Sequence, residues 1–390
     1  MQILSVNFLI FTISGVWRPV EWSSNCAKLL YNALTFVILI LEYFLVTTQF
    51  MDIILVVDNI DDFSTNILMC LTIIGVCCKA TVIVVRQNAV IDLVQMLLLE
   101  PCKIQNEDEI AIQTKFDEFI RTWSIKYSLL AMISVISVTI GSVLNAMQGH
   151  LPYRVWLPFD TNTSLIFWIT SIQQIVIVIF ATFHAIGMET LLFGLFLQTC
   201  AQLEIFENRF HKLVINKTAS YLKHVPTSLN KDKAILSECI YHHLTIYKLI
   251  LSFVHTYAKM VNIIFNQVFF VQFFSSILVL CTSIYYLAEH ITETRAATLL
   301  LYTIGMIVQI YLYCWCGNEV MLMSMKTGHA IYHTDWPLLS VSEKKDLLII
   351  MIRSTRPIKF TSSFLITLSL DSYSNILKTS YSAFNVLQQS

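Results

Sequence analysis

The chain has 390 residues, of which 56% are apolar and only 13% are charged. Soluble domains carry about 25% charged residues, so a water-soluble fold of this composition would have too little polar surface to cover itself, which favours a membrane protein. The net charge of −1 argues against a nucleic-acid-binding protein, because phosphate binding needs clustered lysine and arginine.

Seven stretches of the chain are apolar over about 20 residues, the length that a helix needs to cross the hydrocarbon core. They are residues 31–51, 63–85, 125–147, 165–200, 261–288, 297–322 and the more polar 364–388. No repeat or detachable domain interrupts them, and the first residues lack the basic start of a cleaved signal peptide. We therefore expect one all-α membrane domain over residues 1–390 with seven transmembrane helices.

The basic residues give the predicted helices a direction. Cytoplasmic flanks are enriched in lysine and arginine, and 21 of the 25 basic residues fall on the side of the amino terminus, whereas only Arg154 and Arg295 fall on the opposite side. We expect a cytoplasmic amino terminus and an extracellular carboxyl terminus. A glycosylation acceptor at Asn162 then lies in an outside loop.

Two stretches that follow predicted spans remain helical in pattern but are more polar. In the first, Leu203, Phe206, Phe210 and Leu213 repeat at helical spacing with charged residues opposite. We expect residues 200–260 and 323–358 to continue as helices into the cytoplasm and to pack there. Pro357 removes a backbone donor and disfavours helix in the residue before it, so the helix should be split there and the last membrane helix should begin anew over residues 360–388.

The last predicted span carries a continuous polar stripe. Polar side chains recur on one helical face, and they are Asp371, Asn375, Lys378, Ser382, Asn385 and Gln389. A stripe with an acid and a base is costly against lipid and should face water or protein. It would line a cavity in a single-chain bundle or a pore in an oligomer, and a simple Asp371–Lys378 pair between helices is the alternative.

A second candidate site lies in the outer halves of the spans, where a few hydroxyls and amides occur among apolar side chains. The residues are Met69, Thr72, Ile73, Val138, Gly141, Ser142, Asn145, Phe167, Trp168, Ser171, Gln174, Phe273 and Ile277. Such a set suits a small, weakly polar ligand, although each residue alone is typical of ordinary helix packing. The pattern predicts no charged group in this pocket.

Four ionisable residues also lie within the spans, namely Glu42, Lys79, His184 and Glu189. Intramembrane ionisable groups are functional candidates, but these have no spacing typical of a proton relay. Cys314 and Cys316 lack further ligands at metal-site spacing, and the sequence contains no nucleophile elbow, phosphate loop or zinc motif. We expect no enzyme activity, no metal and no cofactor.

Several motifs in the last third of the chain are similar to one known family. They are Tyr311-Leu312-Tyr313-Cys314-Trp315-Cys316-Gly317-Asn318-Glu319-Val320, then Ile331-Tyr332 with Asp335-Trp336-Pro337, then Ser363-Phe364, and the run from Leu377 to Leu387. Their order and spacing resemble the insect odorant receptors, and weaker similarity, including Gln202-Leu203-Glu204, extends over essentially the whole chain.

The resemblance implies a tetrameric, ligand-gated, non-selective cation channel in the cell membrane of olfactory sensory neuron dendrites. Cytoplasmic helix portions form its central anchor, volatile ligands enter the outer-half pocket, and the last helix lines the pore, here with Lys378 and Tyr381. The chain lacks the enlarged middle loop of the family's coreceptor, so it resembles a tuning subunit that assembles with that coreceptor. The family's hydrophobic gate maps by motif position to Phe384 and Gln388 with Leu387 adjacent, whereas the polar stripe passes through Asn385.

Three alternatives stay open at this point. A G-protein-coupled chemosensory receptor also has seven helices, but it would reverse the charge asymmetry, and its Asp-Arg-Tyr and Asn-Pro-x-x-Tyr motifs do not occur. A gustatory receptor channel of the same superfamily is closer, although the Ser380-Tyr381-Ser382 ending fits the odorant branch better. A secondary transporter would show paired, interrupted helices in its two halves, and none is visible.

Overall fold

The computed structural model describes residues 4–18, 24–57, 60–99, 102–159, 163–223, 231–289, 294–332, 341–362 and 366–389. Its helices are α1 (Ser5–Ile13), α2 (Asn25–Leu55), α3 (Ile60–Val85), α4 (Gln87–Met96), α5 (Glu107–Met147), α6 (Ser164–Lys223), α7 (Lys231–Glu289), α8 (Thr294–Tyr332), α9 (Val341–Ser354) and α10 (Leu370–Gln389). One short antiparallel pair, β1 (Thr361–Ser362) and β2 (Ile366–Thr367), precedes α10. The expectation of a mostly helical protein is confirmed.

Six of these helices, α2, α3, α5, α6, α7 and α8, contain stretches long and apolar enough to cross a membrane. Each coincides with one of the first six predicted spans. α10 occupies the seventh predicted position, but it has 20 residues and a more polar sequence than the six. The chain is therefore a helical membrane protein with six apolar helices of spanning length. The more polar α10 is a seventh span only if its polar face has a function in the membrane.

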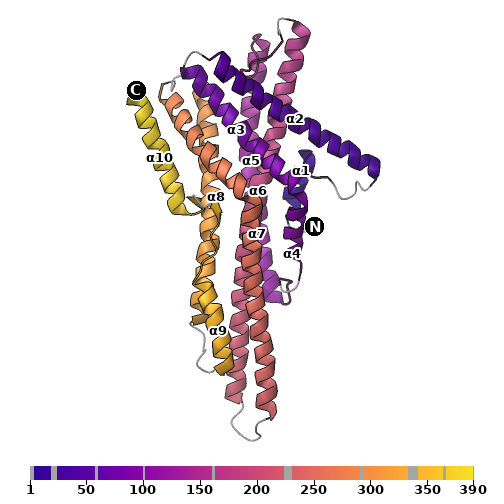
Figure 1. The fold of residues 1–390 in the computed structure, drawn as a ribbon, viewed down its shortest axis with the longest axis vertical. Helices are drawn as coiled ribbons and strands as arrows, with labels where there is room; N and C mark the ends of the chain where they lie inside the picture. Colours follow the sequence, from indigo (N-terminus) through magenta and orange to yellow (C-terminus); the bar gives the residue numbers. More distant parts are fainter. Residues whose placement is uncertain are drawn as a thin grey trace.

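The long helices α6 and α7 have 60 and 59 residues, far more than a bilayer requires. They extend together past the other helices toward one end of the molecule, with α8 and α9 beside them (Figure 1). In the predicted amphipathic stretch, the side chains of Leu203, Phe206 and Phe210 are buried, while the side chain of Leu213 lies outside the described residues. The helical periodicity thus predicted correctly which face of α6 is packed in the part after residue 200, called lower α6 below.

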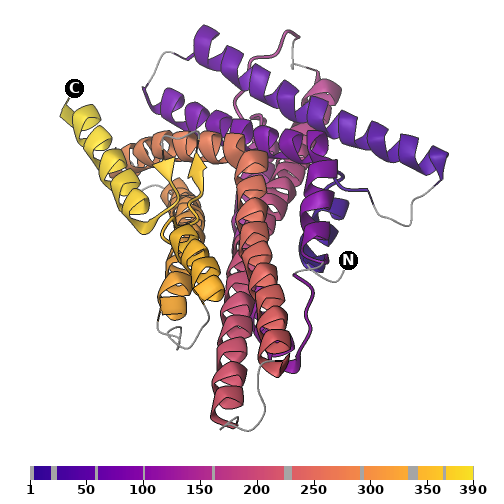
Figure 2. The same cartoon turned by 60° about the horizontal axis from the view of Figure 1, so that its bottom comes forward.

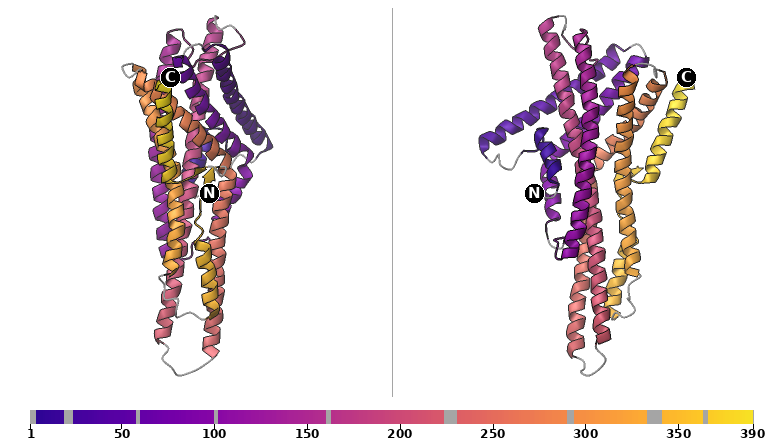
Figure 3. Two further views of the ribbon diagram at one scale, coloured as in Figure 1. Left: turned by 60° about the vertical axis from the view of Figure 1, so that its left-hand side comes forward. Right: turned by 180° about the vertical axis from the view of Figure 1, so that it is seen from behind.

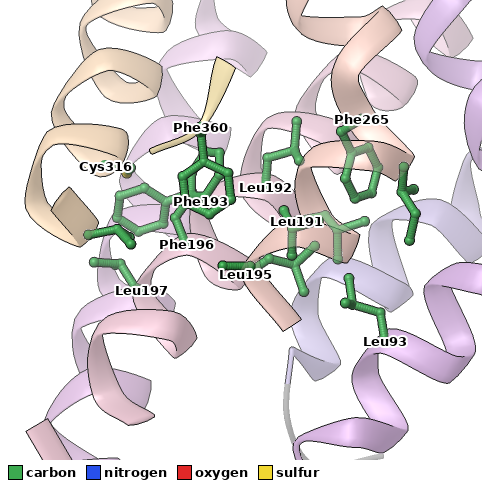
Figure 4. Packing of buried hydrophobic residues seen from close by; sticks show 14 of the residues in the cluster. Leu93, Leu191, Leu192, Phe193, Leu195, Phe196, Leu197, Phe265, Cys316 and Phe360 are labelled. Carbon is green, nitrogen blue, oxygen red and sulfur yellow. The ribbon is translucent and has the colours of Figure 1, made fainter. Parts of the chain in front are cut away.

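The main core lies where α6 meets α7 and α8, midway along the bundle. Figure 4 shows the side chains of Leu191, Leu192 and Phe196 from α6 packing toward Phe265 of α7 and toward Phe360. The ring centroids of Phe196 and Phe360 are 4.5 Å apart. This core fixes the segment before α10 against the centre of the bundle.

The break before α10 is longer than the proline alone predicts. α9 ends at Ser354, ahead of Pro357, and helix resumes only at Leu370, ten residues after the predicted start of the pore helix at residue 360. The strand pair fills part of the interval, with Thr361 opposite Thr367 and Ser362 opposite Ile366. The Thr361 amide donates to the Asn262 side-chain oxygen at 2.8 Å, so a polar contact with α7 holds the strands.

The shorter elements cover one side of the bundle. α2 crosses the bundle at a steep angle near the end that holds the turn between α5 and α6 (Figure 2). α1 packs on α6, where Gly187 and Gly194 leave room for Phe11 and Leu4. α10 lies on the opposite flank against α7 and α8. The carboxyl end of the described chain is near the end of the molecule that holds the turn between α5 and α6 (Figure 3).

Candidate ligand-binding site

A cavity of about 210 Å³ lies among α3, α5, α6, α7 and α8. Most of the side chains that line it are apolar. They are Met69, Val76, Leu130, Ala131, Val135, Val138, Val178, Ala185, Val279 and Met306. A mostly apolar cavity with a few polar groups is the usual form of a small-molecule site.

The hydroxyl groups on the walls are largely satisfied by the protein. Ser134 and Thr182 donate to the carbonyl oxygens one turn earlier in their own helices. The hydroxyls of Thr72 and Tyr302 are hydrogen-bonded to each other and tie α3 to α8 across the cavity. These walls therefore present little unsatisfied polarity to a ligand.

One end of the cavity is strongly polar. Lys79 Nζ lies 2.6 Å from Glu189 Oε1, and the two side chains are only 4% and 7% exposed. Gln309 Nε2 donates to the same carboxylate oxygen at 2.5 Å, and Gln272 Nε2 donates to Gln309 Oε1 at 3.1 Å. Lys79, Gln272 and Gln309 line the cavity, so helices α3, α6, α7 and α8 meet in a continuous polar network at its end.

Glu189 itself faces a smaller cavity next to this network. The smaller cavity measures about 20 Å³ and is lined by Tyr127, Glu189, Tyr313 and Cys316, among others. Tyr127 lines both cavities. The Lys79–Glu189 pair and Tyr127 thus separate the large cavity from the aromatic core of α6 and α8.

The structure brings three of the predicted pocket residues to the cavity wall, namely Met69, Thr72 and Val138. Ser142 and Gln174 lie farther out, where the Ser142 hydroxyl donates to the Tyr153 hydroxyl and the Gln174 side chain accepts from the Tyr153 amide. These two residues hold the loop between α5 and α6 against the bundle rather than lining this cavity.

The other predicted pocket residues are distributed between the core and the surface. Phe273 is buried in the main core with Ile277 against it, and Ile73 lies in a smaller apolar cluster. Ser171 is buried, Asn145 is half-buried, and Gly141 and Trp168 are exposed. Phe167 borders a shallow hollow near Arg154.

The sequence interpretation missed the polar end of the cavity. Lys79 and Glu189 stood out as intramembrane charges, but their pairing joins residues 110 positions apart, and no local spacing reveals such a contact. Tyr127, Gln272, Tyr302 and Gln309 carried no sequence signal that separates them from packing residues. The expectation of a pocket without a charged group does not hold for this cavity.

The face that α10 turns away from its own chain contains most of the predicted polar stripe. Asp371, Asn375, Lys378 and Ser382 are exposed, Asn385 is half-buried, and the predicted pore residue Tyr381 is also exposed. The predicted gate residue Phe384 lies on the other face, buried against the bundle.

Four of the predicted pore, stripe and glycosylation residues lie beyond what the structure describes. The side chains of Leu387, Gln388 and Gln389, and the whole of Asn162, fall outside the described residues. In the described part of the chain, Cys314 and Cys316 are buried free thiols, and no group of three histidine, cysteine or acidic residues is arranged to hold a metal.

This chain is similar in sequence to known proteins of one family. Residues 59–381 match the family described as 7tm Odorant receptor. Odorant receptor 10 of Aedes albopictus is 26% identical over 74% of this chain and 73% of its own length. Odorant receptor 9a of Drosophila melanogaster is 21% identical over 72% and 68%, and Odorant receptor 85f of the same species is 27% identical over 33% of each chain.

A solved structure has the same fold over nearly the whole chain. The insect olfactory receptor OR5 from Machilis hrabei, determined in complex with eugenol, superposes with a TM-score of 0.84 at 17% identity, covering 99% of this chain and 97% of that one. The same receptor without that ligand superposes with a TM-score of 0.83. Because the family match extends over most of the sequence, this chain belongs to the insect odorant receptor family.

Proposed function

We propose that the chain is the ligand-binding subunit of an odorant-gated, non-selective cation channel. The observation that carries this proposal is the mostly apolar cavity lined by α3, α5, α6, α7 and α8 in a member of the odorant receptor family. A small volatile molecule would fill this cavity and bind the open arrangement of the helices more tightly than the closed one, which shifts the population toward the open channel. The similar fold of a receptor determined with eugenol supports this assignment.

The pore would be lined by α10. Its exposed face carries Asp371, Asn375 and Lys378 in the single chain, and such a face needs water or a partner within a membrane. An oligomer with α10 at its axis would meet that need. We propose a heterotetramer with the family's coreceptor, in the membrane of olfactory neuron dendrites, with the lower parts of α6 to α9 as the cytoplasmic anchor between subunits.

The charge distribution supports the orientation of this assembly. Most lysines and arginines lie on the amino-terminal side of the predicted spans, which supports a cytoplasmic location of that side. With α10 as a seventh span, the carboxyl terminus is extracellular. An epitope on Ser390, stained in intact cells that also express the coreceptor, tests this orientation, and staining only after permeabilisation would favour a G-protein-coupled receptor instead.

Current recording from cells that express the chain with the coreceptor tests the ligand site. Ala131→Trp would fill the cavity and should lower agonist sensitivity at least about tenfold, since each 1.4 kcal/mol of lost binding is tenfold. Ile133→Trp on the same helix is the matched control, because Ile133 is 57% exposed and faces away from the cavity. Equal sensitivity of the two variants would place the ligand elsewhere.

A further inference from the structure

The polar end of the cavity has one donor group that the protein leaves partly unused. An ammonium group has three N–H donors, and Lys79 has a single acceptor, Glu189 Oε1, among the residues that the structure describes. The neighbouring amides are occupied by one another and by the same network, because Gln272 donates to Ser276 and Gln309 while Gln309 donates to Glu189. Lys79 is therefore a charged group at the cavity wall with donors left for a ligand.

Because Lys79 is buried, leaving these N–H donors without an acceptor costs free energy. The Lys79 side chain is 4% exposed, so few water molecules can satisfy it, and a buried donor without a partner costs its full desolvation free energy. A ligand that places an acceptor atom at this end of the cavity removes that cost. A hydrocarbon of the same shape would cover the ammonium group without pairing it.

The charge of the site favours a neutral acceptor group on the ligand over a carboxylate. Glu189 already neutralises Lys79 at a distance of 2.6 Å, and Lys79 is the one cationic side chain among the described residues that line the cavity. A carboxylate ligand would add a second negative charge in a buried apolar site with no second cation to balance it, which is costly. A neutral acceptor adds no net charge.

We propose that Lys79 is a specificity-determining residue that selects neutral ligands with an apolar body and a carbonyl oxygen, and that it does so by donating to that oxygen from the end of the cavity. The proposal rests on the cavity being the ligand site, as proposed above. The walls accept the apolar body, because their hydroxyl groups are already bonded to the protein.

Three probes of similar size separate the possible chemistries. Acetophenone has a neutral carbonyl, ethylbenzene has the same skeleton without the oxygen, and benzoate has a carboxylate. Dissociation constants come from ligand-dependent thermal stabilisation of the purified full chain in lipid nanodiscs. We expect acetophenone to bind at least about tenfold more tightly than ethylbenzene, in keeping with a hydrogen bond to a charged donor, and benzoate to bind most weakly.

The variant that tests the role of Lys79 removes both charges together. Lys79→Met alone leaves Glu189 buried and unpaired, which threatens folding, whereas Lys79→Met combined with Glu189→Gln leaves no unpaired charge. In the double variant the ratio of the ethylbenzene to the acetophenone dissociation constant should fall to about one. The matched control is Lys115→Met with Glu204→Gln, an exposed pair 3.3 Å apart and outside the cavity, which should keep the preference of the unmodified chain.

Each outcome bears on the assignment. Equal binding of the two neutral probes to the unmodified chain, tighter binding of benzoate, binding of none of the three, or an unchanged preference in the Lys79 double variant would overturn it. The measurement does not use ionic current. If the chain binds acetophenone through Lys79 but gates no current, the proposed channel function is contradicted, whereas the proposed ligand class is still supported.

Discussion

His184 and Glu42 form a fully buried pair in which Nδ1 of the ring lies 2.8 Å from Oε1 of the carboxyl group. The other ring nitrogen, Nε2, lies 3.0 Å from the Ser14 carbonyl oxygen. A carbonyl only accepts, so Nε2 carries a proton. A second proton lies between Nδ1 and Oε1, because two lone pairs would otherwise face each other. The shared proton thus joins α2 to α6, and the separate bond from Nε2 to the Ser14 carbonyl oxygen joins the pair to the end of α1.

This arrangement predicts unequal effects of two substitutions at Glu42. Glu42→Ala leaves the buried ring without its partner and should lower the free energy of unfolding by about 3 kcal/mol or more. Glu42→Gln should cost much less, because the amide nitrogen can donate to Nδ1 of a neutral ring. Thermal unfolding of the purified variants in detergent measures the difference, and equal losses for alanine and glutamine would contradict the shared proton.

A second buried pair predicts a dependence on pH. Glu109, on the part of α5 that precedes the predicted span, accepts from Arg209 Nε at 2.9 Å and from Nη2 at 2.7 Å. Burial raises the pKa of the Glu109 carboxyl, but the hydrogen bonds from Arg209 and from the Gln105 amide outweigh it, and the pKa lies below its ordinary value of 4.5. The carboxylate form is therefore favoured by folding.

Glu109→Gln should accordingly destabilise the protein by about 3 kcal/mol at neutral pH, since it leaves Arg209 buried beside a neutral partner. The stabilisation by a carboxyl whose pKa falls on folding is fully present above 4.5 and is lost as the pH falls through the folded-state pKa. The unfolding curves of the variant and the unmodified chain should therefore converge in acid. Glu107→Gln, exposed in the first turn of the same helix, is the control and should change little at any pH.

Most of the architecture could be predicted from the sequence, because membrane helices depend on local composition. The six predicted spans that coincide with long helices are apolar over the length that a helix needs to cross a membrane, and the buried face of lower α6 repeats at helical spacing. The strand pair before α10 could not be foreseen, since it depends on a long-range contact between Thr361 and Asn262. α10 begins only after this strand pair, at Leu370.

The candidate site was harder to predict than the fold. Hydroxyls such as Ser142 and amides such as Gln174 suggested a pocket by their position, yet their hydrogen bonds go to Tyr153. Lys79 was visible as an isolated charge, but its role depends on where Glu189 and Gln309 arrive from α6 and α8. Periodicity gives the face of one helix, whereas a cavity depends on how five helices cross.

Gly317 shows how closely Leu368, the residue that follows β2, approaches α8. A Cβ atom at this position would lie 2.5 Å from Leu368 Cβ and 2.6 Å from the Leu368 carbonyl oxygen, so backbone has to move to admit it. Gly317→Ala should destabilise the protein by about 1 to 3 kcal/mol, as overpacking does. Gly141→Ala is the matched control, because its Cβ meets nothing within 4 Å and alanine favours helix over glycine by about 1 kcal/mol. A stabilising Gly317→Ala would show that Leu368 does not pack against α8 as described.

The two faces of α10 allow a direct test of the proposed pore. Ser382 is exposed on the polar face, whereas Ser380, two residues earlier, is 1% exposed and bonded to the Ile376 carbonyl against the bundle. Each is replaced by cysteine, and a charged, membrane-impermeant thiol reagent is applied from outside while an odorant opens channels that contain the coreceptor. If α10 lines the pore, Ser382→Cys should lose most of its current, because the added charge stands in the ion path. Ser380→Cys should lose little, as should the unmodified chain with its own cysteines. Block of Ser380→Cys without block of Ser382→Cys would mean that α10 is rotated in the assembly, and block of neither would remove α10 from the ion path.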